Sequence, residues 1–153
     1  MQIKIKGENK RISLKELRFA TKWMSSLIMS SQLLKGLQLT ITFKSEKGLA
    51  GSTEITDYEN RLPKEFIIRL DPTEYRTQTL RTLAHELVHV KQFARGEMVE
   101  LIRTNYTKWN KQYIKESKFD YFDLPWEIEA FGREYGMYRR YIDHIKDKRI
   151  KFE

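Results

Sequence analysis

Apolar and polar residues alternate along four short segments of the chain. They are residues 3–6, 37–43, 53–59 and 65–70. Successive side chains of a β-strand point to opposite faces of a sheet, so this alternation predicts four strands. The last of them, "EFIIRL", is followed closely by a long segment with a different period.

Three longer segments carry the apolar repeat of a helix instead. The first covers residues 14–34, where Ser13 and Glu16 form a capping box at its start. A second helix is expected over residues 71–96, and a third from Pro125, a favoured first-turn residue, to about Lys146. Residues 97–124 have strand and turn character with weak periodicity.

The predicted elements follow one another as strand, helix, strands, helix, mixed segment and helix, with no repeat and no internal linker. A chain of 153 residues has the size of one ordinary domain. We therefore expect a single α+β domain over residues 1–153, in which a small mixed sheet packs against two or three main helices.

The second helix contains the segment "TLAHELVHVKQF", residues 82–93. At about 100° per residue, Leu83 and Leu87 lie on the core face, whereas His85 and His89 lie on nearly the opposite side. Phe93 shares the histidine side, so we expect this helix to be covered on both sides. Two imidazoles four residues apart lie one above the other and can bind one cation.

Glu86 projects to the flank of such a cation. From there its carboxylate can accept a proton from a metal-activated water rather than act as a ligand. Only three histidines occur in the chain, and two of them fall in this motif. The pattern His-Glu-x-x-His therefore predicts a zinc site formed by His85 and His89, with Glu86 as general base.

With these residues, preceded by "EFIIRL", the sequence resembles the zincin metallopeptidases. The resemblance implies a zincin-like fold, a Zn²⁺ cofactor and hydrolysis of peptide bonds in a peptide or protein substrate. In that superfamily a strand upstream of the motif helix lies along the cleft and pairs with an extended substrate. The metzincin continuation is absent, because no histidine follows His89 in the next segment, "VKQFARGEMVE".

A catalytic zinc usually has a third protein ligand, and three residues are candidates: Glu127, Glu129 and His144. The last helix carries an apolar stripe at helical spacing, formed by Ile128, Phe131, Tyr135, Tyr138 and Ile142. If this stripe faces the core, Glu127 lies within about 50° of its centre and Glu129 points to solvent. We therefore favour Glu127 as the ligand, and we interpret His144 as a cation at the C-terminal end of the helix.

The last helix also resembles the third-ligand helix of gluzincins, in which a small residue follows the ligand glutamate by three positions. Here Ala130 follows Glu127 in that way. Many gluzincins carry Asp or Asn four residues after the glutamate, to support a ligand histidine. Phe131 occupies that position here, so this support must come from elsewhere.

The net charge of +8 leaves a second hypothesis open. In this hypothesis the protein is a basic, nucleic-acid-associated zinc protein, similar to SprT-like proteases that act on DNA-bound proteins, or a non-catalytic zinc-binding module. SprT-like proteases generally use a third histidine, which has no counterpart after this motif. Two groups of basic residues are candidates for nucleic-acid contact: Lys4, Lys6, Lys10, Arg11 and Lys15, and Arg139, Arg140, Lys146, Lys148 and Arg149.

The chain contains no cysteine, which excludes a disulfide framework and thiolate metal ligands. No apolar run approaches the length of a membrane span, and the first residues, "MQIKIKGENK", lack the apolar stretch of a signal peptide. We therefore expect a cytoplasmic protein without membrane contact.

Overall fold

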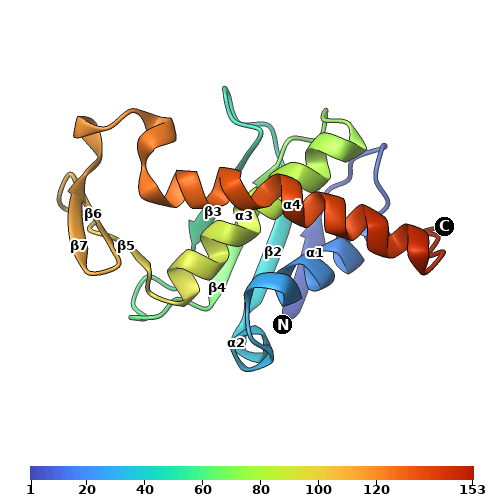
Figure 1. Ribbon diagram of the computed structural model, residues 1–153, viewed down its shortest axis with the longest axis horizontal. Coiled ribbons are helices and arrows are strands. Elements are labelled where there is room, and N and C mark those ends of the chain that lie inside the picture. The colour runs from blue at the N-terminus through green and yellow to red at the C-terminus, as the bar shows by residue number, and fades with distance from the viewer.

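A four-stranded mixed sheet forms the base of the molecule in the computed structural model, which describes residues 1–153 (Figure 1). Strands β1 (Gln2–Lys6), β2 (Gln38–Phe43) and β4 (Glu65–Leu70) are parallel, and β3 (Gly51–Ile55) is antiparallel to β4. The order across the sheet is β1-β2-β4-β3. β4 is therefore paired on both sides, whereas β3 is an edge strand.

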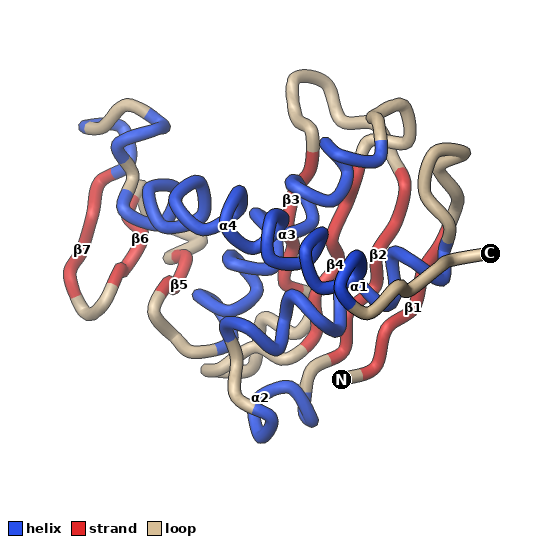
Figure 2. The backbone as a smooth tube through the Cα atoms, turned by 45° about the vertical axis from the view of Figure 1, so that its right-hand side comes forward, coloured by secondary structure: helices blue, strands red, loops and turns tan.

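Three main helices, α1 (Leu14–Ile28), α3 (Arg76–Ala94) and α4 (Pro125–Asp147), lie over one face of this sheet (Figure 2). Alternating strand residues face them and are buried: Leu39, Ile41, Phe66, Ile68 and Leu70. The predicted α+β class, with a mixed sheet and three main helices, is confirmed. None of the helices combines the length and the apolar character needed to cross a membrane.

The first predicted helix is interrupted. α1 ends at Ile28, and a short helix, α2 (Ser31–Gly36), follows it. The side chain of Ser30 accepts a hydrogen bond from the backbone N–H of Leu33 and so caps the new helix. Met29 and Ser30 both have extended backbone angles, so the expected single helix over residues 14–34 is wrong at this point.

The strand predicted over residues 53–59 is also displaced, since β3 covers Gly51–Ile55. The carboxylate of Asp57 accepts hydrogen bonds from the side chain of Asn60 and from the backbone N–H groups of Lys64 and Glu65. These bonds hold the chain in a turn where the sequence pattern suggested a longer strand.

The weakly periodic segment forms a separate small sheet, visible at the left of Figure 1. β5 (Met98–Glu100), β6 (Tyr106–Trp109) and β7 (Gln112–Lys115) are antiparallel, and two 3₁₀ turns, η1 (Glu116–Lys118) and η2 (Tyr121–Asp123), lead into α4. This segment follows Gly96, whose φ of +68° ends α3.

Candidate metal centre

Two helices far apart in the sequence bring three potential metal ligands together. α3 supplies His85 and His89, and α4 supplies Glu127; all three side chains are buried. The two Nε2 atoms lie 3.1 Å apart, and Glu127 Oε2 and Oε1 lie 3.2 and 3.5 Å from His85 Nε2 and His89 Nε2. The ligand atoms of these residues all lie within 4.8 Å of one another, a spacing suited to one ion.

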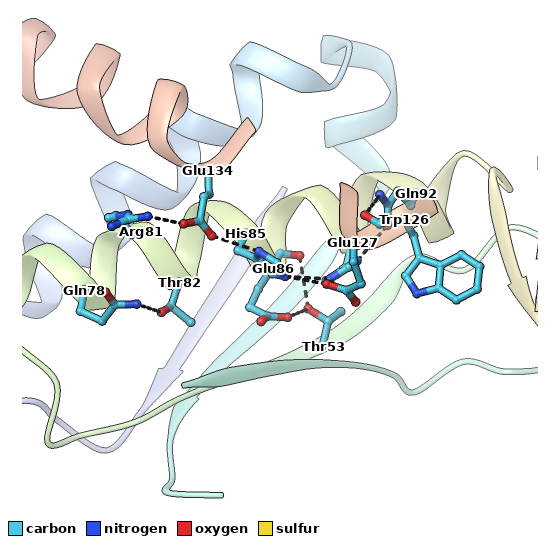
Figure 3. A network of polar contacts seen from close by, with 11 residues as sticks. Thr53, Gln78, Arg81, Thr82, His85, Glu86, Gln92, Trp126, Glu127 and Glu134 are labelled. Carbon is cyan, nitrogen blue, oxygen red and sulfur yellow. Dashed lines mark hydrogen bonds and ion pairs between the residues drawn. The ribbon is translucent and has the colours of Figure 1, made fainter. Parts of the chain in front are cut away.

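The opposite nitrogen of each imidazole is held by an oxygen (Figure 3). His85 Nδ1 lies 3.1 Å from Glu134 Oε2, and His89 Nδ1 lies 2.8 Å from Gln92 Oε1. Gln92 Nε2 donates to the Trp126 carbonyl, so the amide must present its oxygen to His89. Both Nδ1 atoms therefore face acceptors and must carry the hydrogen.

In a neutral imidazole with hydrogen on Nδ1, Nε2 bears a lone pair. Here two such lone pairs and a carboxylate point at one another in a buried space. Glu127 Oε2 is buried and accepts no hydrogen bond. Electron-rich atoms in this arrangement repel unless a positive charge lies between them, so the residues present fit a bound cation.

The pKa shifts of His89 and Glu127 also indicate that a positive charge is stabilised at this site. Burial opposes protonation of His89, but the carboxylates of Glu127 and Glu86 outweigh it and raise the pKa of His89. Burial opposes ionisation of Glu127, yet the two histidines hold its pKa at about 2. Protons or a metal ion must therefore balance the ionised Glu127.

Glu86 points toward the edge strand β3, away from the Glu127 carboxylate (Figure 3). Its Oε2 accepts a 2.7 Å hydrogen bond from Thr53 Oγ1 on β3. Burial raises the pKa of Glu86, and Thr53 and the histidines oppose that rise. The strand approaches closely because residue 51 is glycine: a Cβ there would lie 2.5 Å from Thr82 Cγ2 and 3.2 Å from Glu86 Oε1.

A pocket of about 300 Å³ opens over these residues. Ser52 and Thr53 of β3 form one wall, and Tyr121 of η2 and Trp126 of α4 line it as well. Burial and the neighbouring Glu127 carboxylate raise the pKa of Tyr121, so its hydroxyl stays protonated at neutral pH. The pocket thus offers a buried base, a neutral hydroxyl donor and the three potential ligands.

The other two candidates for the third ligand are engaged elsewhere. The sequence suggested that Glu129 faces solvent, but this is wrong. Its carboxylate pairs with Lys91 and accepts a 3.0 Å hydrogen bond from Gln92. His144 lies toward the other end of α4, where its ring stacks on Trp23 at 4.9 Å between centroids. Neither belongs to the group that can hold a metal ion.

Glu127 was selected on the expectation that the apolar stripe of the last helix faces the core, and this expectation is wrong for much of the stripe. The apolar stripe expected to face the core is largely exposed at its N-terminal end, with Ile128 and Tyr135 each 57% exposed. The buried face of α4 is instead formed by Glu127, Ala130, Glu134, Met137 and Tyr141. Glu127 therefore lies on the buried face itself rather than beside it.

The strand that borders the site is not the expected one either. "EFIIRL" forms β4, which is fully paired inside the sheet and has no free edge. β3 borders the site instead, because it pairs antiparallel with β4 on the side of β4 that faces away from β2.

Three residues at the site were missed in the sequence: Thr53, Gln92 and Glu134. Glu134 supplies the support for His85 that Phe131 lacks, and its second oxygen pairs with Arg81. Its position seven residues after Glu127 places both on one helix face, which is the signal that could have revealed it.

Comparison of the chain with models of protein families, with curated proteins and with solved structures found no match.

Proposed function

We propose that this protein is a zinc-dependent metallopeptidase of the zincin type. His85, His89 and Glu127 are the zinc ligands in this proposal, and Glu86 is the general base. One observation carries the proposal. The Nε2 atoms of His85 and His89 converge on the buried carboxylate of Glu127, whose Oε2 accepts no hydrogen bond, and Thr53 holds the carboxylate of Glu86 beside them.

A bound Zn²⁺ would supply Lewis acidity, activating a water molecule and polarising the scissile carbonyl. The protein's own residues supply the proton handling. Glu86, kept close by Thr53, takes the proton from the attacking water and returns it to the leaving amine. Tyr121 lines the same pocket and provides a neutral donor for the developing oxyanion.

The edge strand β3 favours a peptide over other carbonyl substrates. Its outer side has no partner strand, and Ser52 and Thr53 line the pocket. An extended peptide can add to such an edge through main-chain hydrogen bonds, which places successive carbonyls along the pocket.

The decisive experiment measures the zinc content of the variants Glu86→Gln and Glu127→Gln and their rate of hydrolysis of an added, unfolded protein substrate. We expect Glu86→Gln to keep one equivalent of zinc while turnover falls by about a hundredfold or more. Glu127→Gln should lose zinc first, and activity with it. Glu8→Gln, at an exposed position far from the site, is the matched control. Full activity in Glu86→Gln would contradict the role of the base.

A second candidate function rests on the basic residues near the two chain ends. In Figure 2, strand β1 and the C-terminus lie on the same side of the molecule, at the right. We propose, as the alternative, weak sequence-independent nucleic-acid contact there by a SprT-like protease or a non-catalytic zinc module. Affinity for random DNA should fall steeply as salt rises, and absence of binding at low salt would remove this alternative.

A further inference from the structure

An exposed apolar surface covers the N-terminal half of α4 and the turn before it. Its members, here called the α4 outer patch, are Phe119, Tyr121, Phe122, Ile128, Phe131 and Tyr135, which are 40–64% exposed. The rings of Tyr121, Phe122 and Phe131 contact one another in edge-to-face or tilted geometry, with Phe122 and Phe131 5.4 Å apart between centroids. At about 200 Å² for each fully exposed side chain, the patch presents on the order of 600 Å².

A patch of this size lies at the upper end for a monomeric protein surface. The C-terminal continuation of the same stripe is covered within the chain. Ile142 is buried, and Tyr138 and Ile145 pack against the core. The stripe is therefore covered along its C-terminal half, whereas its N-terminal half stays largely exposed, although Phe131 contacts the ring of His85 edge to face.

Two glycines extend the uncovered half. Gly132 and Gly136 are both exposed in the interior of α4, and a Cβ at either would meet no atom within 4 Å. Glycine destabilises a helix interior relative to alanine, and nothing in this chain needs the space that they leave. Small residues next to an apolar stripe allow a second helix to approach closely.

We propose that the α4 outer patch is a homodimer interface, in which α4 of one molecule packs against α4 of a second copy. A two-fold axis brings the same patch of both copies together, so an apolar patch is complementary to itself. Two such patches bury on the order of 1,200 Å², the lower end of the range for stable interfaces. Tyr121 also lines the pocket of the candidate metal centre, so the second copy lies beside its mouth.

The net charge of the protein makes the salt dependence of dimer formation differ from that of binding to an anionic partner. Each chain carries a net charge of +8, so two copies repel, and salt weakens that repulsion. Self-association through an apolar patch should therefore strengthen as salt rises. Binding of an anionic surface, such as a vesicle with acidic lipids, should weaken instead.

Sedimentation equilibrium of the full chain over a wide concentration range, at low and high salt, tests the proposal. We expect a monomer–dimer equilibrium with a dissociation constant on the order of micromolar, tighter at high salt. Ile128→Lys and Gly132→Glu should each raise this constant about tenfold or more. The control Ile102→Lys changes an isoleucine that is 75% exposed outside the patch and should leave it unchanged.

Gly132→Glu adds a readout that distinguishes an interface from a structural role. Replacing an exposed helical glycine should raise the melting temperature of the dilute, monomeric protein while it weakens the dimer. A wild-type protein that stays monomeric at every concentration and salt level would overturn the proposal. So would a dimer that both patch variants leave intact, or a Gly132→Glu monomer that melts earlier than the wild type.

Discussion

Two polar clusters each join α3 to α4, the first also including α1, and they differ in how their charges are balanced. In the first, Glu16 of α1 accepts hydrogen bonds from Arg76 of α3 and from the hydroxyl of Tyr141 on α4. In the second, the candidate metal centre, Glu127 of α4 faces the Nε2 atoms of His85 and His89 on α3, and Glu127 Oε2 accepts no hydrogen bond.

The first cluster is complete without any further group, because a cation and a hydroxyl lie opposite its carboxylate. The second has more acceptors than donors. Burial of polar groups is costly unless they are paired, so an unbalanced buried cluster indicates a ligand, whereas a balanced one serves the fold. The following predictions test this distinction.

Zinc should have the largest effect. Saturating zinc is expected to stabilise the fold by about 4 kcal/mol at a thousandfold excess over the dissociation constant. The raised pKa of His89 stabilises the metal-free protein at low pH, and this contribution is lost as pH rises through that pKa. Zinc binding requires the unprotonated ring, so the difference in melting temperature between zinc-loaded and chelator-treated protein should widen from about pH 6 to 8. A constant difference would argue against His89 as a ligand.

Arg76→Ala should have the next largest effect, and on folding alone. It leaves Glu16 buried with only Tyr141 as partner, which should lower the free energy of unfolding by about 2–3 kcal/mol, less than for a fully buried pair because Arg76 is partly exposed. Zinc affinity should stay unchanged. Arg139→Ala, which breaks an exposed ion pair with Asp143, is the control and should cost less than about 1 kcal/mol in urea denaturation.

Glu134→Gln should weaken zinc binding by about 10- to 100-fold while the protein stays folded. The carboxylate holds His85 Nδ1–H, and its removal makes the ligand nitrogen less basic and its orientation less fixed. Competition with a chromophoric chelator measures the affinity, and Asp143→Asn on the same helix is the control. Unchanged affinity would show that Glu134 does not support the ligand.

Glu129→Gln should have the smallest effect, with zinc affinity falling by less than about tenfold. Glutamine at this position can still accept from Gln92, and Lys91 keeps Glu97 as a partner at 2.8 Å. Zinc content measured beside that of Glu127→Gln separates the two carboxylates. If Glu129→Gln lost the metal and Glu127→Gln kept it, the ligand assignment would be wrong.

The repeating patterns of the sequence predicted the elements of the fold well, but not where Ser30 and Asp57 interrupt them. Both residues use a side-chain oxygen to bind backbone N–H groups, a local competition that hydrophobic periodicity does not register. The three parallel strands, β1, β2 and β4, and the start of α4 followed directly from alternation and from Pro125.

At the site, spacing alone identified the pair of histidines, because helix geometry determines their proximity. Glu127 was selected from a stripe assumed to be buried, and the structure leaves the N-terminal half of that stripe exposed. Hydrophobicity could not reveal this, since the true buried face of α4 includes two glutamates whose burial depends on histidines of another helix. Long-range polar pairing of this kind has no signature within a single segment.

The segment that contains the small sheet β5–β7 connects the end of α3 to the start of α4. Both anchoring helices are held together through contacts that do not involve the sheet, and the ends of the connecting segment therefore stay close whatever its length. Doubling such a connection costs only about 0.6 kcal/mol in chain entropy. Met98, Glu100 and Glu116 of this segment line the pocket, so exchanging it for another sequence would change the pocket wall while the helices that carry the potential metal ligands stay in place.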